Sequence, residues 1–331
     1  MKILITGGTG FIGSHLVRRL LLENMTPQIL ALPGDRIPAD FEQAGVKVYR
    51  GDIRDYPSLV PVLQGVDTVF HTAALVTDWA PLKLFHEVNI QGMDNMLRAS
   101  VSAGVTRFVT ISTNDVFGVV EDVLIDETFP LKKWGEPYAD TKIEAEKLVW
   151  KYYVERRLPV TMVYPCWVYG PGDATFMPAL LKAIRRGDML FWRKAARLWP
   201  TYIDNLIDLL MVLRSHPAAV GNGYLVHDGE SVALEKFCRE VAKRQACPPP
   251  TRCIPYGLAL AAARVMETLW KAARRPTRPL LTTYAVKNLG SCLRFSIQKA
   301  EKELGWQPKI SFSEGFEITM AWLENNPSFK E

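Results

Sequence analysis

The chain has 331 residues, which is long enough for one large α/β domain or two ordinary domains with a substantial core. Hydrophobic residues make up 48% and charged residues 23%, proportions that are typical of globular proteins. The formal net charge of +5 is modest for this length, and the aromatic residues are not interleaved with basic runs. The composition therefore gives no indication of a nucleic-acid-binding protein.

The five cysteines are irregularly spaced, and no two of them have C-x-x-C spacing. This pattern favours neither a zinc site nor a disulfide framework, and reduced thiols are expected. The first residues, MKILIT, have the pattern of a strand rather than of a signal peptide. The apolar runs stay well below the about 18 residues needed to span a bilayer. We expect a cytoplasmic protein without a bound metal.

The first half of the chain alternates short apolar runs with amphipathic stretches. Candidate strands cover residues 2–6, 28–32, 46–49, 67–71, 107–112 and 160–164, with a later one at 223–227. Between several of them lie segments with helical periodicity, such as 11–24 and 82–100. Strands that alternate with helices in this way predict an α/β fold, in which helices cover both faces of a parallel sheet.

The segment TGGTGFIG directly follows the first predicted strand and opens directly into a helix. Read as G-x-x-G-x-x-G, it places Gly7, Gly10 and Gly13 at the turn, with Phe11 and Ile12 beside them. Glycine permits close approach of a pyrophosphate, and the helix N-terminus offers free N–H groups and a positive dipole end. We therefore expect a Rossmann-type, doubly wound domain that binds a dinucleotide.

The boundary of this domain is expected near residues 169–173. Residues 1–170 would form the NAD(P)-binding domain, with its sheet completed by about 201–228. Residues 171–331 would form a smaller, mainly α-helical substrate-binding region that is interleaved with the first.

The second predicted strand bears on the choice of cofactor. An NAD site usually has an acid at the end of this strand, but Ala31 and Leu32 stand there, and Asp35 and Arg36 follow in the loop. Arg36 could meet the 2′-phosphate of NADP, or it could be a solvated loop charge. The pattern leaves NAD and NADP open and leans slightly toward NADP.

Several further motifs occur in a fixed order. They are GDIRD (51–55), HTAA (71–74), YADTK (138–142), VYGPGD (168–173), TYIDNL (201–206) and the stretch 295–316. With the glycine loop, they make the chain resemble the extended short-chain dehydrogenase/reductases, a part of the NAD-dependent epimerase/dehydratase superfamily. The resemblance runs nearly from end to end.

The resemblance implies further cofactor contacts. Asp52 would contact the adenine edge with Ile53 beside it, Ala73 would line the cofactor, and Pro165 and Val168 would form the turn that faces the nicotinamide. The cofactor set then consists of Gly7, Gly10, Phe11, Ile12, Gly13, Arg36, Asp52, Ile53, Ala73, Tyr138, Lys142, Pro165 and Val168.

The resemblance also implies a catalytic set of Thr113, Tyr138 and Lys142. Tyr138 and Lys142 are spaced i, i+4, so both side chains lie on one helix face, and a nearby ammonium lowers the pKa of a phenol. Tyr138 would protonate a carbonyl oxygen as hydride arrives, and Lys142 would also hold the nicotinamide ribose. Successive strand residues point to opposite faces, so only one of Ser112 and Thr113 can face the nicotinamide, and the spacing favours Thr113. By itself the motif also suits a solvated helix.

The second half of the chain bears on the substrate. Nucleotide-sugar enzymes of the superfamily typically carry an arginine at the position of Leu198 to grip a diphosphate, whereas Arg197 is one residue away. Trp192, Trp199 and Tyr202 favour an apolar ring or acyl chain instead, although some of them could be core residues. The expected substrate contacts are Thr113, Trp192 and Tyr202.

Residues 255–275 predict an amphipathic helix with a basic C-terminal end. One face carries Leu258, Ala262, Val265 and Leu269, and the end carries Lys271, Arg274 and Arg275. With the segment that follows, this helix resembles the branch of 3β-hydroxysteroid dehydrogenases, sterol-4-carboxylate dehydrogenases and dihydroflavonol reductases. It could cover an apolar pocket, dock peripherally on a membrane, or be an ordinary core helix.

The expected function is an NAD(P)-dependent oxidoreductase that interconverts a secondary alcohol and a ketone on a small hydrophobic substrate. Steroid-like, flavonoid-like and 3-oxoalkanoate-like compounds are the preferred classes. A nucleotide-sugar epimerase or dehydratase and a non-catalytic NAD(P) sensor are the alternatives. The resemblance implies a homodimer through the helices that carry residues 84–103 and 138–157.

Overall fold

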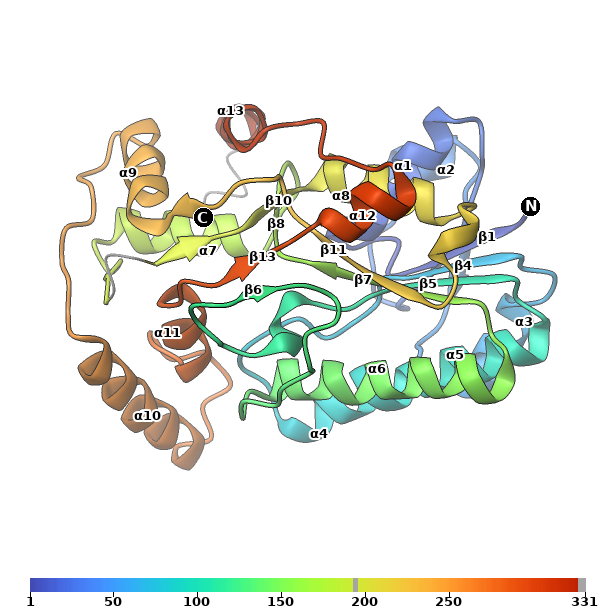
Figure 1. Ribbon diagram of the computed structural model, residues 1–331, viewed down its shortest axis with the longest axis horizontal. Helices are drawn as coiled ribbons and strands as arrows, with labels where there is room; N and C mark the ends of the chain where they lie inside the picture. The colour runs from blue at the N-terminus through green and yellow to red at the C-terminus, as the bar shows by residue number, and fades with distance from the viewer. Residues whose placement is uncertain (193–195, 327–331) are drawn as a thin grey trace.

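The computed structural model describes residues 1–192 and 196–326 of the chain. Within them, seven parallel strands form one central sheet in the order β3-β2-β1-β4-β5-β7-β11 (Figure 1). The strands are β1 (Ile3–Thr6), β2 (Gln28–Ala31), β3 (Lys47–Arg50), β4 (Thr68–His71), β5 (Arg107–Ile111), β7 (Val160–Pro165) and β11 (Asn222–Val226). The predicted Rossmann-type parallel sheet is confirmed. The strand order reverses between β1 and β4, which is where such sheets bind their ligands.

Helices cover both faces of this sheet. On one face lie α3 (Tyr56–Val62), α5 (Gly92–Ala103) and α6 (Pro137–Arg156), and on the other lie α1 (Phe11–Leu22), α8 (Ile203–Leu213) and α12 (Gln298–Leu304) (Figure 1). Every residue of β1, β4 and β7 is buried, as expected for parallel strands that are covered on both sides. The sheet is thereby fixed rigidly, and its carboxyl ends can hold a site.

The predicted helix at 82–100 consists of three segments in the structure. They are α4 (Leu82–Phe85), a π-helical turn (His86–Gln91) and α5. Asn89 lies in the π-turn, and its amide donates to the Leu75 carbonyl at 3.2 Å and accepts from the Leu75 N–H at 2.8 Å. The turn thus fastens the segment after β4, which runs past the cofactor side of the sheet.

The second half of the chain builds a separate helical region and also returns to the sheet through α8 and β11. In that region α7 (Phe176–Arg185), α9 (Leu234–Arg244) and α13 (Phe312–Asn325) share an apolar core. Short strands complete it, namely β6 (Leu124–Ile125), β8 (Trp167–Tyr169), β9 (Arg197–Leu198), β10 (Pro200–Tyr202), β12 (Val232–Ala233) and β13 (Arg294–Phe295).

Two further helices, α10 (Tyr256–Ala272) and α11 (Thr283–Leu289), stand at one corner of the molecule. We call this helix pair, residues 256–289, the cap (Figure 1). In the described residues, the cap packs on a small apolar cluster of four buried side chains, those of Ala259, Ala263 and Val286 from the cap and Trp192 from outside it. No helix in the described part of the chain is long and apolar enough to cross a membrane.

Candidate active site

The glycine loop between β1 and α1 is packed too tightly for side chains. Gly7 has φ +67°, and a Cβ on Gly7 would lie 3.0 Å from the backbone of Ala73. A Cβ on Gly13 would lie 2.1 Å from the Gly7 carbonyl oxygen. The N–H of Gly10 closes the turn on that same oxygen at 2.9 Å, and α1 begins at the next residue, Phe11. The loop therefore brings bare backbone and the N-terminus of α1, with Phe11 and Ile12, to the switch point of the sheet, where a pyrophosphate fits.

The end of β2 turns a carboxylate toward this loop. Asp35 Oδ2 accepts hydrogen bonds from the Thr9 hydroxyl at 2.6 Å and from the Leu32 N–H at 3.2 Å. Arg36, the residue that favoured NADP in the sequence, is exposed. An acid is therefore present near the end of β2, as NAD sites usually have, but it belongs to the loop that follows the strand. Sequence reasoning noted Asp35 without assigning it, because only the folded loop brings it to Thr9.

The turn that is expected to face the adenine follows β3. Arg54 donates to Asp52 through its N–H at 2.9 Å and through its guanidinium, which lowers the pKa of the Asp52 carboxyl. Ile53 is buried against Gly92, and the Asn95 amide donates to its carbonyl at 3.0 Å. Asp52 and Ile53 are therefore held in a fixed turn beside the sheet.

The turn that is expected to face the nicotinamide lies where β7 ends at Pro165 and β8 carries Val168. The segment after β8 reaches back to the glycine loop, because His15 of α1 contacts the Pro171 carbonyl at 2.8 Å. Tyr164 is buried, and its hydroxyl donates to Glu146 of α6 at 2.5 Å. This bond ties the end of β7 to the helix that carries Tyr138.

Thr113 and Tyr138 meet at the carboxyl end of β5. Both side chains are buried, and the Thr113 hydroxyl acts on the Tyr138 phenol by holding its pKa down. Ser112 points elsewhere, with its hydroxyl donating to Glu146 at 3.3 Å. One turn further along α6, the Lys142 ammonium donates to the Ile111 carbonyl at 2.7 Å. Thr113, Tyr138 and Lys142 are thus brought together, and Ser112 faces away from Tyr138.

The protonation of this pair differs from the simple expectation. Burial raises the pKa of the Tyr138 phenol well above its usual value, the Asp115 carboxylate raises it further, and the Thr113 hydrogen bond opposes the rise. Burial also lowers the pKa of Lys142 to about 8. Desolvation therefore dominates the pKa of the phenol, and the expected lowering by Lys142 is not found. The phenol is protonated, which suits a proton donor.

His71, at the end of β4, lies in the same buried layer. Its Nδ1 is 2.8 Å from the Thr6 hydroxyl, and burial together with the nearby charge of Lys142 lowers the pKa of His71 to about 3. The imidazole is therefore neutral and has a structural hydrogen bond.

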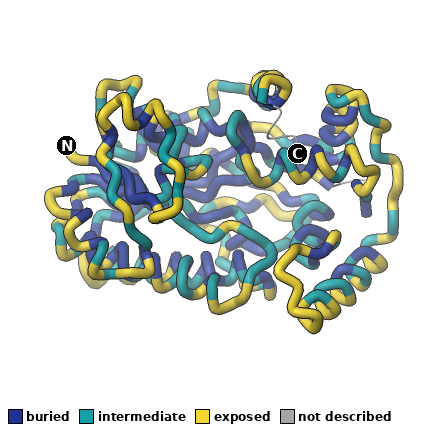
Figure 2. The backbone as a smooth tube through the Cα atoms, turned by 180° about the vertical axis from the view of Figure 1, so that it is seen from behind, coloured by how far each residue is buried: buried dark blue, intermediate teal, exposed yellow. Residues whose placement is uncertain are grey.

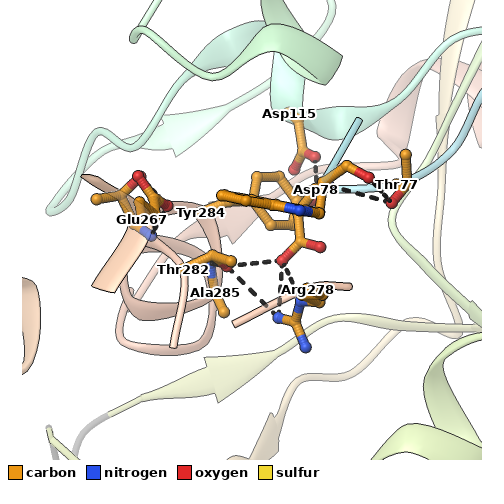
Figure 3. Close-up of polar contacts among 10 residues, drawn as sticks. Thr77, Asp78, Asp115, Glu267, Arg278, Thr282, Tyr284 and Ala285 are labelled. Atoms are coloured by element: carbon orange, nitrogen blue, oxygen red, sulfur yellow. Dashed lines mark hydrogen bonds and ion pairs between the residues drawn. The ribbon is translucent and has the colours of Figure 1, made fainter. Parts of the chain in front are cut away.

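Asp115, two residues after Thr113, was not singled out from the sequence. It is buried, and its carboxylate accepts a hydrogen bond from the Tyr284 hydroxyl at 2.7 Å (Figure 3). It accepts another from the Asn288 amide at 3.1 Å. Burial raises the pKa of Asp115 to about 6, and the two hydrogen bonds oppose the rise. Because Tyr284 and Asn288 come from α11, Asp115 ties the catalytic loop directly to the cap.

Two more acids fasten α11 to the sheet domain. Asp78 accepts from Arg278 at 2.7 Å and from the Thr282 hydroxyl at 2.6 Å (Figure 3). Glu136, just before α6, pairs with Lys287 at 2.8 Å. Together with Asp115 these bonds hold α11 over the site. These three contacts could not be predicted from local sequence patterns, because each joins segments more than 150 residues apart.

The two aromatic residues expected to touch substrate lie in apolar cores. Trp192 packs with Ala259, Ala263 and Val286 beneath the cap, and its indole donates to the Val286 carbonyl at 2.8 Å. Tyr202 is buried against Tyr169, with ring centroids 5.5 Å apart. Both residues are therefore core residues, which was the alternative to substrate contact. The aromatic pair that does lie beside Asp115 is Trp134 and Tyr284, stacked at 5.8 Å.

No group of three or more His, Cys, Asp and Glu side chains that could hold a metal ion occurs among residues 1–192 and 196–326. Thr113, Tyr138, Lys142 and the glycine loop are the chemically distinctive groups of the site.

Comparison with known proteins gives the same assignment. Residues 3–226 match the model of the NAD dependent epimerase/dehydratase family. A 2-alkyl-3-oxoalkanoate reductase of Stenotrophomonas maltophilia is 30% identical over 324 residues, covering 95% of this chain and 97% of the relative. A 3 beta-hydroxysteroid dehydrogenase/Delta 5→4-isomerase of Mycobacterium tuberculosis is 31% identical, covering 93% of this chain and 86% of the relative.

Solved structures agree in fold. The crystal structure of gox2253 superposes with a TM-score of 0.82 at 26% identity and covers 98% of both chains. The dTDP-glucose 4,6-dehydratase DesIV of Streptomyces venezuelae, solved with NAD bound, has a TM-score of 0.80 at 25% identity, covering 99% of this chain and 98% of its own. The chain therefore belongs to the NAD-dependent epimerase/dehydratase family and is an NAD(P)-dependent oxidoreductase of the extended short-chain dehydrogenase/reductase type.

Proposed function

We propose that the protein interconverts a ketone and a secondary alcohol on a small hydrophobic substrate. The observation that carries this proposal is that Thr113 and Tyr138 are both buried at the carboxyl end of β5, with Lys142 one turn further along α6. A buried, protonated phenol beside a hydroxyl is placed to protonate a carbonyl oxygen as hydride arrives.

In this mechanism Tyr138 donates its phenolic proton to the substrate oxygen, and Thr113 donates a second hydrogen bond that sets the angle of the carbonyl. The glycine loop would hold a nicotinamide cofactor, which would supply the hydride in reduction and accept it in oxidation. Lys142 would hold the ribose side of that cofactor and stabilise the phenolate that forms when the proton has left. In the reverse direction the phenolate takes the proton of the alcohol.

Charge pairing supports an apolar substrate over a nucleotide diphosphate. Leu198 is buried where the sugar-nucleotide enzymes typically have an arginine, and the neighbouring Arg197 donates to Ser231 at 2.7 Å. The cations nearest the site on the cap side, Arg278 and Lys287, are paired with Asp78 and Glu136. A diphosphate would have to displace these partners, whereas the stacked Trp134 and Tyr284 suit an apolar ring or chain.

The curated relatives named above favour the same class. One reduces 2-alkyl-3-oxoalkanoates and the other is a 3 beta-hydroxysteroid dehydrogenase, by their names. We therefore take 3-oxoalkanoates and 3β-hydroxysteroids as the first compounds to test, and flavonoid ketones as the next.

For the cofactor, the fold favours NAD, whereas the sequence leaned slightly toward NADP. The Asp35 carboxylate, held by Thr9, would accept hydrogen bonds from the ribose hydroxyls of NAD and would repel the 2′-phosphate of NADP. Arg36 works in the opposite direction, so the two residues compete. Because Asp35 is fixed on the glycine loop and Arg36 is exposed, we propose NAD as the preferred cofactor.

Thermal shift tests this choice. The wild-type protein should be stabilised more by NAD than by NADP at equal concentration. Asp35→Ser should move the preference toward NADP by roughly tenfold in affinity, about 1.4 kcal/mol, while the neighbouring Arg36→Ser should move it further toward NAD. A wild type that prefers NADP, with Arg36→Ser reversing that preference, would restore the interpretation based on Arg36.

The proposed assembly is a homodimer through α5 and α6, which lie side by side on one face of the sheet (Figure 1). Val154 of α6 is 74% exposed in the single chain, so a partner helix has an apolar side chain to cover. Sedimentation velocity should give a dimer for the wild type and a monomer for Val154→Glu. A monomeric wild type would contradict the proposed dimer but would leave the proposed reaction unaffected.

The decisive experiment is a substrate panel that follows NAD(P)H. It compares a 2-alkyl-3-oxoalkanoate, a 3β-hydroxysteroid, a flavonoid ketone and two nucleotide sugars, each with both cofactors. Turnover of an apolar compound that is lost in Tyr138→Phe supports the proposal. Turnover of a sugar nucleotide would favour the epimerase or dehydratase alternative, and cofactor binding with no turnover of any compound would favour a sensor.

A further inference from the structure

The helix α10 exposes its large apolar residues and buries small ones. Leu258, Val265 and Leu269 are 59%, 59% and 58% exposed, whereas the buried residues of this helix are Ala259 and Ala263. The amphipathic face predicted from the sequence is real, but it points away from the protein. The interpretation of this segment as an ordinary core helix is therefore wrong.

The exposed residues form one continuous stripe. Leu258, Ala261, Val265, Leu269 and Ala272 are spaced by three or four residues, and all five are exposed, so they lie along one side of α10. Figure 2 shows α10 at the edge of the molecule with exposed residues along its outer side. A stripe of this kind costs free energy in water and indicates a surface that is covered in use.

Basic residues border this stripe. Arg264 and Lys271 lie beside it at i and i+7, and Arg274 and Arg275 follow at the end of the helix, all exposed. The carboxylate of α10, Glu267, is turned inward, where it accepts hydrogen bonds from the Thr283 N–H at 2.7 Å and the Thr283 hydroxyl at 2.9 Å. The outer face of α10 thus combines apolar side chains with positive charge, and its acid is engaged on the inner side.

The turn at the end of α10 adds aromatic and apolar side chains. Trp79 donates from its indole to the Arg275 carbonyl at 3.4 Å and lies beneath the Lys271 ammonium, and Trp270 packs under the Arg275 guanidinium. Leu280 beyond the turn is 57% exposed. Tryptophans next to arginine and lysine are the side chains that settle at the boundary between lipid headgroups and acyl chains.

We propose that the outer face of α10 docks on the surface of an anionic lipid bilayer. Leu258, Val265 and Leu269 enter the boundary of the acyl chains, and Arg264, Lys271, Arg274 and Arg275 contact anionic headgroups. A second copy of the chain fits this face poorly, because a two-fold contact through the stripe would bring the same four cations against their own copies. This docking is independent of the substrate class proposed above.

Vesicle flotation of the full chain tests the proposal. Vesicles of phosphatidylcholine with phosphatidylglycerol should carry the wild-type protein, and vesicles of phosphatidylcholine alone should carry much less. Added salt should release the protein, since each basic residue contributes roughly a fivefold change in binding and the attraction is screened within about 10 Å at 0.1 M salt. Arg274→Glu/Arg275→Glu should bind at least tenfold less.

A matched pair of variants isolates the stripe. Val265→Glu/Leu269→Glu should abolish flotation, whereas Leu22→Glu/Ile318→Glu, which makes the same change in charge at exposed apolar residues 81% and 41% exposed on α1 and α13, should float like the wild type. Equal melting temperatures for the two variants verify that both are folded. The proposal is overturned if the wild type does not float, or if the stripe variant floats as well as the control. It is also overturned if the stripe variant loses a dimer by sedimentation velocity without any vesicle binding.

Discussion

At the carboxyl ends of β4 and β5, four polar side chains are buried, those of His71, Thr113, Tyr138 and Lys142. His71 ends β4, Thr113 follows β5, and Tyr138 and Lys142 lie on α6, and the apolar residues of these three elements belong to one extended core. The cap rests on four buried side chains in the described residues and on polar bonds to Asp78, Asp115 and Glu136. The catalytic groups are thus fixed by apolar packing that extends in every direction, whereas the cap is fixed by a few specific polar contacts.

This difference separates two tasks. Apolar packing on both faces of a sheet is cooperative and holds atoms to the accuracy that proton transfer needs. The cap instead has a small apolar core, and an element with few buried apolar contacts opens locally more readily, as a segment over a substrate site must do. We therefore expect changes at the strand ends to affect chemistry or cofactor binding, and changes at the anchors to affect the cap.

The largest effect is expected from Tyr138→Phe. Removal of the phenolic proton donor should lower kcat by about 10²–10⁴-fold, while the thermal shift with cofactor stays close to that of the wild type. Stopped-flow measurement of hydride transfer checks the first point. Activity retained in this variant would show that another group donates the proton.

The second largest effect is expected from Gly13→Ala, which should weaken cofactor binding rather than the chemical step. Its Cβ would lie 2.1 Å from the Gly7 carbonyl oxygen and 2.8 Å from Gly8 Cα, so the loop must shift and binding should fall by roughly a hundredfold, about 3 kcal/mol. Gly257→Ala, with nothing within 4 Å, is the control and should bind normally. Calorimetric titration with cofactor measures both, and equal affinities would argue against the glycine loop as the binding site.

Tyr284→Phe tests the anchoring of the cap. The change leaves the buried Asp115 carboxylate with one donor fewer, which should cost about 1–3 kcal/mol and loosen α11. We expect KM to rise more than kcat falls, and hydrogen exchange to increase in residues 278–291. Tyr224→Phe is matched to it, because it also removes a phenolic bond to a carboxylate, at 2.9 Å from Glu303, away from the cap. An equal KM for both variants would mean that the anchor does not control the cap.

The smallest effect is expected from His71, on the loss of folding stability at acidic pH. Its folded pKa of about 3 lies below the ordinary 6.5, so its contribution to stability is complete above pH 6.5 and is lost as the pH falls toward 3. The slope is about 1.4 kcal/mol per pH unit. Asp115, with its pKa raised to about 6, acts in the opposite direction, since its contribution is lost as the pH rises through 6.

The measurement is therefore a difference between variants. Unfolding by urea at several pH values should show a shallower loss of stability on acidification for His71→Asn than for the wild type. Parallel curves would indicate that His71 is not buried as the neutral imidazole.

Much of the sheet domain could be predicted from the sequence because its signals are local. The glycine spacing, the alternation of strands with helices, and the i, i+4 pair of Tyr138 and Lys142 depend on periods of a few residues. The split of the helix at 82–100 by a π-turn had no such signal, since it depends on the packing of Asn89 against Leu75 and of Gly92 against Ile53.

The sequence by itself determined the family and the parallel sheet and predicted the catalytic residues, because each signal lies in neighbouring positions. Only the tertiary structure decided that Asp35 turns to Thr9, that Asp115 meets Tyr284 across 169 residues, and that the apolar face of α10 points outward. It also decided that Tyr138 is a protonated acid with a raised pKa. Desolvation and contacts between distant segments set these properties, and both depend on how the whole chain packs.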